Sequence, residues 1–419
     1  MEKNKIKTPK IKISESLFLS PMVRINTLPF RLLCFELGCD YTFTEEIISK
    51  KLKNSQKIFN KDLNTYDYIH NKDNTLILRI SPSEINHLFL QIGASNVEDA
   101  IESIKIVKDE IIGVDLNMGC PKHFSTHGNM GSSLLNYPEL AKEILTQMKI
   151  NFPNKLISCK IRLLEDNKKF EFLIENLLQS NIDFISIHFR YKEQNSKFPA
   201  NWEKISYVKK LLNNKIPFNI NGDVLSPKDI YYLHKLHPEC GFLIGRGAIH
   251  NPNIFNEYKN NEKILELEFD NNKINNIKEI NNKEIKLNED VKNNNIKDEE
   301  VKLSIKLTKE LSKKYNKDID IIPLVKRYIE ICLENGNNFG NTKYNVLYIL
   351  KTHKKFIELF QKIQKIKEYK NLVELFELKD YYENILKNHP DFVKYYNNII
   401  IKKEEEISNE INNKYINNI

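Results

Sequence analysis

The chain has 419 residues, of which 41% are hydrophobic, and its 64 Lys and Arg against 56 Asp and Glu give a formal net charge of +8. This length allows one large domain and a smaller one with a sizeable core, and the charge is compatible with a polyanionic partner. No apolar run reaches the roughly 18 residues of a membrane span, and the basic tail, residues 1–13, has no apolar stretch behind it, so we expect neither a membrane segment nor a secretory signal.

Short apolar runs that end in glycine, proline or polar residues predict buried strands. They occupy residues 17–19, 41–44, 89–93, 114–116, 156–162, 184–188, 217–220 and 241–244. Segments with helical spacing lie between them at residues 29–37, 97–107, 138–148, 170–178, 205–212 and 230–236. Another run, residues 76–80, competes for the third position, but the helical pattern directly after residues 89–93 favours the later run.

Eight strands that alternate with helices over roughly 240 residues predict an α/β fold, a (β/α)8 TIM barrel over residues 14–256. Helices are then expected to form a ring around the strands. An open, doubly wound sheet is the alternative. Such a sheet usually carries a G-x-G-x-x-G turn after its first strand, and this sequence has none there.

Residues 257–303 have a different composition, with twelve asparagines, nine lysines and twelve acidic residues but no glycine or proline. This composition predicts a disordered insert. Helical spacing returns over residues 304–396, where Phe356, Leu359, Phe360 and Ile363 fall on one apolar face. We expect a small all-α domain with many lysines there, and a frayed tail over residues 397–419.

A cysteine lies at the tip of the loop after the fourth strand. Cys120 follows the β-branched run that starts at Gly113, within a glycine-containing loop, and barrels place reactive groups at the C-terminal ends of their strands. A buried, inert thiol is the alternative interpretation. The six cysteines show no CxxC pair and no metal-ligand spacing. They predict reduced thiols, no metal site and a reducing compartment, the cytoplasm with the nucleus as the alternative.

Polar and glycine residues follow the other strands, and the predicted barrel brings them to one rim. Glycine turns after the last two strands are common phosphate sites, because backbone N–H groups can approach the anion there. A lysine within an apolar strand, Lys160, needs an anionic partner. Together these features predict a phosphate-bearing planar cofactor opposite a thiol. Turns that bind nothing, a Lys160 that pairs with Glu45 or Asp115, and a purely structural His188 are the alternatives.

Nine motifs occur in a fixed order along the chain. They are PMVRINTLPFRLL (21–33), EE (45–46), QIG (91–93), DLNMGCPKHFSTHGNMGSSLL (115–135), CKIR (159–162), HFRYKEQ (188–194), NGD (221–223), GRGAIHNPNIF (245–255) and NTKY (341–344). With these motifs the chain resembles the tRNA-dihydrouridine synthases, most closely the eukaryotic D-loop type that acts at position 20. The sequence NMGCPK followed by GxMG is the most specific part of this resemblance.

The resemblance implies an FMN enzyme that reduces the C5=C6 bond of a tRNA uridine, with NADPH or NADH reducing the flavin. Cys120 resembles the general acid that protonates C5, while Asn117, Lys122 and Arg190 resemble substrate-binding residues. The residues that resemble the FMN site are Pro21, Met22, Val23, Gln91, Lys160, His188, Asn221, Gly222, Asp223, Gly245 and Arg246. The helical domain is then expected to bind tRNA. We expect a monomer that needs no metal and no membrane.

The chain departs from the family pattern at two positions. Phe189 stands where a glycine is usual, which predicts crowding near the flavin phosphate, and His127 stands where a lysine is common, which predicts a different tRNA contact. We expect no double-stranded-RNA-binding domain, which some eukaryotic members carry, directly after the helical region. Two other interpretations remain open, an FMN barrel that acts on a free pyrimidine and a tRNA-binding barrel without catalysis.

Overall fold

The computed structural model describes residues 10–261, 265–266, 319–351 and 353–396. The chain forms two compact units, residues 1–59 with 65–319 and residues 60–64 with 320–419. The predicted insert, residues 257–303, lies almost wholly outside the described residues, as do the tails at 1–9 and 397–419. Where the described part continues past residue 256, helix α10 (Ile254–Asn260) extends the barrel unit beyond its predicted end.

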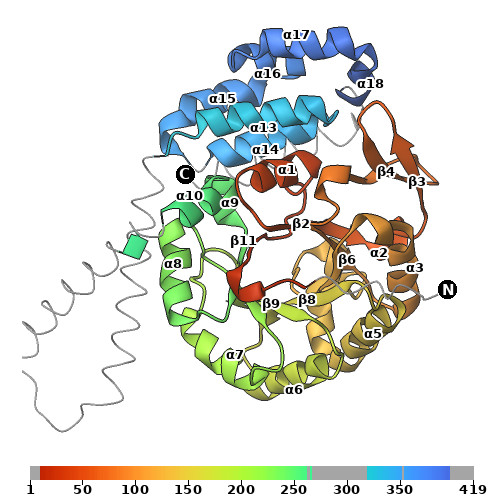
Figure 1. Ribbon diagram of the computed structural model, residues 1–419, viewed down its shortest axis with the longest axis vertical. Coiled ribbons are helices and arrows are strands. Elements are labelled where there is room, and N and C mark those ends of the chain that lie inside the picture. Colours follow the sequence, from red (N-terminus) through yellow and green to blue (C-terminus); the bar gives the residue numbers. More distant parts are fainter. Residues whose placement is uncertain (1–9, 262–264, 267–318, 352, 397–419) are drawn as a thin grey trace, which may run out of the picture. The chain divides into compact units, whose positions relative to one another are not determined.

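The first unit is a closed barrel of eight parallel strands, which confirms the predicted TIM barrel (Figure 1). Its neighbours follow the order β1-β11-β10-β9-β8-β7-β6-β2, with β2 closing on β1. The strands are β1 (Leu17–Leu19), β2 (Tyr41–Ile48), β6 (Leu88–Gly93), β7 (Gly113–Asn117), β8 (Leu156–Leu163), β9 (Phe184–Tyr191), β10 (Phe218–Asn221) and β11 (Gly241–Ile244). All eight predicted strands are therefore present.

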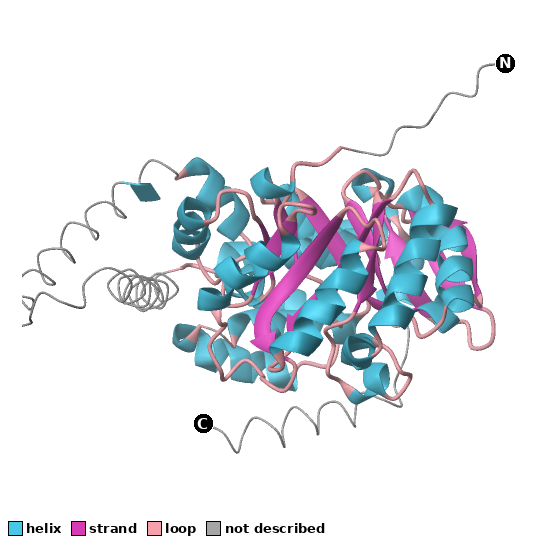
Figure 2. Cartoon of the chain, turned by 90° about the horizontal axis from the view of Figure 1, so that it is seen from below, coloured by secondary structure: helices cyan, strands magenta, loops and turns pink. Residues whose placement is uncertain are grey.

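Helices surround the strands (Figure 2). They are α1 (Leu28–Glu36), α2 (Ser49–Leu52), α3 (Val97–Val107), α4 (His123–Thr126), α5 (Pro138–Asn151), α6 (Asn167–Leu178), α7 (Ile205–Leu212), α8 (Pro227–Leu236), α9 (Arg246–His250) and α10. Side-chain caps set several starts, because an oxygen satisfies a backbone N–H that has no partner within the helix. Asn96 caps α3, Asp166 caps α6 and Ser226 caps α8.

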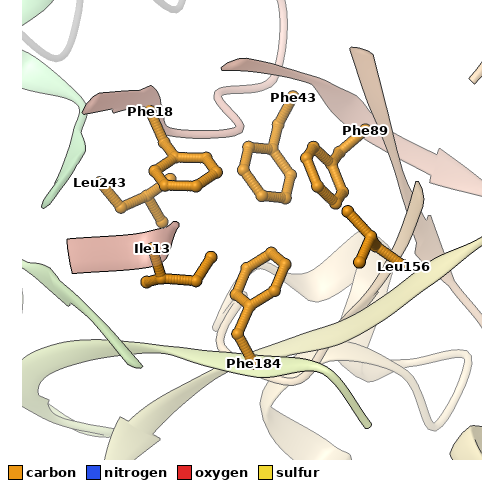
Figure 3. Packing of buried hydrophobic residues seen from close by; sticks show 7 residues of the cluster. All are labelled: Ile13, Phe18, Phe43, Phe89, Leu156, Phe184 and Leu243. Carbon is orange, nitrogen blue, oxygen red and sulfur yellow. The ribbon is translucent and has the colours of Figure 1, made fainter. Parts of the chain in front are cut away.

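The barrel interior is filled by apolar side chains near the beginnings of the strands (Figure 3). Phe43 and Phe89 stack with ring centroids 5.0 Å apart, and Phe184 meets Phe89 edge-on at 5.5 Å. Phe18, Leu156 and Leu243 complete this plug together with Ile13. The barrel is thus a packed core and not a channel, and any site must lie beyond the plug.

The register of the strands places polar residues directly beyond the plug. Phe89 pairs with Gly113, and two residues further on Gln91 pairs with Asp115. Because strand side chains alternate, residues two apart share a face, so Gln91 points inward like Phe89. The next pairs along the strands are Asn117 with Lys160, Arg162 with His188, and His188 with Asn221. The predicted rim therefore exists at the C-terminal ends of the strands.

A three-stranded sheet that the sequence did not predict stands apart from the barrel. It consists of β3 (Ser55–Asn60), β4 (Thr65–His70) and β5 (Leu76–Ile80), and β4 pairs with β5 antiparallel. The run at residues 76–80 is thus a strand but not a barrel strand, which confirms the preference for residues 89–93. Arg31 on α1 makes two hydrogen bonds to Glu84, directly after this sheet, at 2.6 and 2.8 Å.

The second unit is helical, as predicted. Its described helices are α13 (Ile322–Glu334), α14 (Phe339–Leu350), α15 (Ile357–Lys365), α16 (Tyr369–Leu375), α17 (Lys379–Asn388) and α18 (Val393–Tyr396). Tyr369 lies at its centre, where its hydroxyl bonds Thr342 and the carbonyl of Asn337. Lys343 donates to two carbonyls at the end of α15, at 2.9 and 2.7 Å. The NTKY motif therefore serves the packing of this unit.

Among the residues that the structure describes, no helix combines the length and the apolarity needed to cross a bilayer. Within the same part of the chain, no three His, Cys, Asp or Glu side chains gather in a way that could hold a metal ion.

Candidate active site

The loop that carries Cys120 follows β7 and folds back on itself. The side-chain oxygen of Asn117 accepts hydrogen bonds from the backbone N–H groups of Gly119 and Cys120, both at 3.0 Å. The Cys120 carbonyl accepts a bond from the Ser132 N–H at 2.9 Å. Gly131 has φ +57°, and a Cβ there would lie 2.7 Å from the Cys120 carbonyl oxygen, so the close approach requires glycine. The half-buried thiol is held at the barrel mouth by its own loop.

Gln91 and Asn117 belong to one buried network. Gln91 donates to Asp115 at 2.7 Å and accepts from Asn117 at 2.9 Å. Ser158 also donates to Asp115, at 2.7 Å. Burial raises the pKa of Asp115 to about 6, although both donors favour the carboxylate. The network fixes the orientation of both amides and, through Asn117, the place of the cysteine loop.

Cations gather along β8 and β9 and at the start of α9. Burial is the main reason that the pKa of Lys160 falls to about 8, and Arg162 adds to this effect. Burial also lowers the pKa of His188 well below its ordinary value, and four cations act in the same direction. These cations are Lys160, Arg162, Arg190 and Arg246. A bound anion would relieve their mutual repulsion, so the electrostatics of the mouth favour an anionic ligand.

A chain of hydrogen bonds sets the protonation of His188. Its Nε2 lies 3.1 Å from Arg190 Nη1. Because a guanidinium can only donate, His188 accepts at Nε2 and carries its proton on Nδ1. Arg190 also donates to the Phe198 carbonyl at 2.8 Å and to Asp223, which accepts from Arg246 as well. Arg190 is 2% exposed. It therefore holds its neighbours in place and does not present its guanidinium to a substrate.

The turn after β10 brings the backbone close to His188. Gly222 has φ +114° and Asp223 has φ +58°, so two consecutive residues are left-handed. A Cβ on Gly222 would lie 3.0 Å from His188 Cδ2. The Asn221 side chain donates to the Leu243 carbonyl on the neighbouring strand at 2.6 Å. Glycine is required here, because its left-handed backbone passes close to the imidazole and to Ala200, whose Cβ would lie 3.1 Å from a Cβ at this position.

The loop after β1 reaches the end of β11. Pro21, Met22 and Val23 are half-buried. Asn26 fastens this loop by donating to two backbone carbonyls, at 2.9 and 2.8 Å. A Cβ on Gly245 would lie 3.6 Å from Met22 Sδ. The first and last strands of the barrel thus close the same wall of the site.

Sequence reasoning assigned no role to Glu46. The register of β2 against β6 shifts between Phe43 and Glu46, where a β-bulge adds one residue and turns the Glu46 side chain inward. Glu46 accepts a hydrogen bond from Ser125 Oγ at 2.6 Å. Burial and the Glu46 charge raise the pKa of Cys120 to about 11. The doublet Glu45-Glu46 is visible in the sequence. A β-bulge, however, cannot be recognised from the alternation of polar and apolar residues, so the direction of the Glu46 side chain could not be predicted.

The family model described as "Dihydrouridine synthase (Dus)" matches residues 18–316, which is more than half of the chain. The chain belongs to the dihydrouridine synthase family. The tRNA-dihydrouridine(20) synthase [NAD(P)+] of Schizosaccharomyces pombe is 35% identical over 62% of this chain and 57% of its own length. That of Saccharomyces cerevisiae is 32% identical over 57% of this chain and 66% of its own length.

The tRNA-dihydrouridine(20a/20b) synthase [NAD(P)+] of Saccharomyces cerevisiae is 29% identical over 57% of this chain and 61% of its own length. The chain thus matches less than two thirds of the length of these three relatives. A solved structure of ligand-free DHODH from Eimeria tenella is 12% identical over 58% of this chain and 82% of its own, with a TM-score of 0.41, a likeness too distant to indicate function.

In this dihydrouridine synthase family member the predicted site residues lie around the barrel mouth, and two predicted substrate-binding residues differ in their exposure. Arg190 is buried, as described, whereas Lys122 is exposed on the outside of the cysteine loop. Phe189 does not crowd the site, because His188 and Arg190 bond each other on one face of β9 and the residue between them points to the other face. His127 is exposed on the same loop, stacked on His123 with centroids 4.9 Å apart.

Proposed function

We propose that this protein is an FMN-dependent tRNA-dihydrouridine synthase that reduces the C5=C6 bond of a D-loop uridine at position 20, with NADPH or NADH as the reductant. The observation that carries the proposal is the pairing of a protonated thiol, Cys120, with a cation-rich wall around Lys160 and His188 at one barrel mouth. The names of the two fission-yeast and budding-yeast relatives support position 20 and the nicotinamide.

The residues of the mouth fit FMN. Four cations lie around His188, and an anion such as a phosphate would be stabilised by their positive charge. Gly222 lets the turn after β10 pass close to the imidazole, so that backbone of this turn can approach the same anion. Arg246 lies partly exposed at the same place, with 36% of its side chain open to solvent, and can contact a phosphate while its other side is held by Asp223. We therefore propose that these residues hold the phosphate.

Lys160 and Gln91 lie deeper in the barrel and would hold the ring of the cofactor. The chemistry that bound FMN supplies is hydride transfer to C6 of the uracil ring. Lys160, charged when an anion sits beside it, would stabilise negative charge on the ring edge. Pro21, Met22 and Val23 would close the remaining wall and exclude water.

Cys120 provides the proton. Reduction at C6 leaves negative charge on C5 and its neighbouring carbonyl, and C5 needs a proton from the opposite face. Burial and Glu46 raise the pKa of Cys120 to about 11, so the thiol is protonated at neutral pH and can act as a general acid. A nucleophilic cysteine would show the reverse shift. The target base must leave its stack to enter the mouth.

Substitution Asn117→Ala should lower the rate of tRNA reduction by about tenfold to a hundredfold, because misplacement of a reacting group by about 1 Å has effects of this size. The variant loses the oxygen that holds the Gly119 and Cys120 N–H groups. Asn117→Asp keeps that oxygen but loses the donation to Gln91, so the two variants together separate the loop contact from the contact to Gln91. Equal rates for Asn117→Ala and the wild type would show that the loop holds Cys120 without this side chain.

The helical unit is proposed to bind tRNA through an exposed lysine group, Lys354, Lys355, Lys362 and Lys365. Each phosphate that the protein no longer neutralises should reduce the slope of log affinity against log salt by about 0.7 to 0.9. We expect Lys362→Ala with Lys365→Ala to weaken tRNA binding and flatten this slope in filter-binding assays. The substitution Lys343→Ala is not a binding test, since Lys343 caps α15. An unchanged slope would place the tRNA elsewhere.

The proposed function is tested by incubating unmodified tRNA transcript with purified protein, FMN and NADPH, followed by mapping of dihydrouridine. We expect the modification at position 20. A tRNA without dihydrouridine after incubation with flavin-loaded protein would contradict the proposal. All residues of the proposed site come from one chain, so we propose that a monomer suffices for activity. We also propose that the protein acts in a compartment that keeps its thiols reduced, such as the cytoplasm.

A further inference from the structure

We propose that Glu46 is a positioning residue that keeps the Cys120 sulfur protonated and fastens its loop until the base is protonated. This inference rests on the proposed function, because it assigns a task to a residue that acts through the general acid. Proton transfer from Cys120 to the base does not itself require Glu46.

The first support is the placement of the carboxyl group. The bulge in β2 turns Glu46 into the mouth, where it is 7% exposed. Its Oε1 accepts the Ser125 hydroxyl from the cysteine loop. Its Oε2 is buried and has no hydrogen-bond partner among the described residues. A buried carboxylate oxygen is costly to leave without a donor, and the Cys120 thiol, which interacts with Glu46, can supply one.

The second support is the space kept for this carboxyl. A Cβ on Gly93, at the end of the adjacent strand β6, would lie 2.7 Å from Glu46 Oε1. Any other residue at position 93 would displace the carboxyl from Ser125. The adjacent Glu45 makes a different contact, since it accepts a hydrogen bond from the backbone N–H of Arg24. The two neighbouring glutamates therefore serve different parts of the structure.

The third support is electrostatic. Three cations act on Cys120, namely Lys122, Lys160 and Arg162, and all of them favour a thiolate. The charge that suits a flavin phosphate would thus ionise the thiol that must donate a proton. Burial and the Glu46 carboxylate oppose this tendency. The pKa of Glu46 is itself raised by burial, while hydrogen bonding from Ser125 and Cys120 and the charge of Lys122 favour its carboxylate.

The test measures alkylation of Cys120 by iodoacetamide against pH, in the full-length flavin-loaded protein, with the modified peptide quantified by mass spectrometry. We expect Glu46→Gln to lower the midpoint of the profile by about one pH unit or more, which raises the alkylation rate near pH 8 about tenfold because the thiolate fraction rises tenfold per unit. The glutamine keeps an oxygen for Ser125.

Two control variants separate charge from accessibility. Ser125→Ala loosens the loop but keeps the Glu46 charge, so the plateau rate should rise while the midpoint stays. Glu45→Gln removes a neighbouring charge and should change neither. A Glu46→Gln midpoint equal to that of the wild type would overturn the proposal. If Glu46→Gln does not fold, a wild-type midpoint at or below the ordinary thiol value of about 8.5 would overturn it equally.

The readout does not depend on tRNA reduction. An unchanged midpoint in Glu46→Gln, combined with loss of reduction in Cys120→Ala, would remove only the role of Glu46. A shifted midpoint in a protein that reduces no tRNA would leave the role of Glu46 intact and remove the proposed function.

Discussion

Substitution Cys120→Ala should lower the rate of dihydrouridine formation by about a hundredfold to ten-thousandfold, the usual contribution of a general acid. Flavin binding should persist, because no side chain proposed to hold FMN bonds the Cys120 sulfur. The rate is measured in single turnover with reduced protein and unmodified tRNA. The flavin content is measured from the visible absorbance of the same sample.

Cys34→Ala is the matched control, since it makes the same change at a fully buried thiol on α1, outside the site. It should keep the rate within a factor of a few. A Cys120→Ala variant that reduces tRNA at the wild-type rate would end the assignment of Cys120 as the proton donor, whatever its flavin content.

Substitution Asp223→Ala should destabilise the barrel by about 3–5 kcal/mol, because removing one partner of a buried ion pair leaves the other charge uncompensated. Asp223 accepts from Arg190 and Arg246, and also from the Ala200 N–H at 2.7 Å. Arg190, which is 2% exposed, would lose its only described carboxylate partner and release His188. We expect the purified variant to lack flavin and to unfold at a lower urea concentration.

The contribution of Asp223 to the free energy of unfolding should decrease as the pH falls. The arginines lower the pKa of Asp223 below its ordinary value. The ion pairs therefore contribute fully above about pH 4, the unfolded value, and are lost as the pH falls through the lowered folded pKa. Asp223→Asn keeps an acceptor for Ala200 and should lie between wild type and Asp223→Ala. A free energy of unfolding of Asp223→Ala, measured in urea, within about 0.5 kcal/mol of that of the wild type would contradict this account.

Much of the barrel could be predicted from local patterns. Helices α3 and α7 have the predicted bounds, Val97–Val107 and Ile205–Leu212, because apolar periodicity alone sets their buried faces. Strands β2 and β9 run past their apolar predictions, to Ile48 and Tyr191. The added segments contain charged residues, Glu45 and Glu46 in β2 and Arg190 in β9, so apolar patterning alone did not predict them.

Other features depended on long-range contacts that a sequence does not display. The sheet of β3, β4 and β5 is an insertion between two barrel strands. The sequences of β3 and β4 contain many polar residues, so no strand was predicted there. The inward turn of Glu46 follows from one extra residue in β2. The hydrogen bonds that bury Arg190 join it to three residues elsewhere in the chain, which its local sequence does not show. In each case the tertiary context, and not the local sequence, decided the role.

The central claim is that one barrel mouth combines a reducing flavin with a proton donor for a uracil held in tRNA. The most direct measurement mixes anaerobically reduced protein with unmodified tRNA and follows the return of the oxidised flavin absorbance. We predict reoxidation by this tRNA with one dihydrouridine formed per flavin, and none by the same tRNA already modified at position 20. Reoxidation by free uridine monophosphate at the same rate, or no reoxidation by unmodified tRNA, would contradict the account.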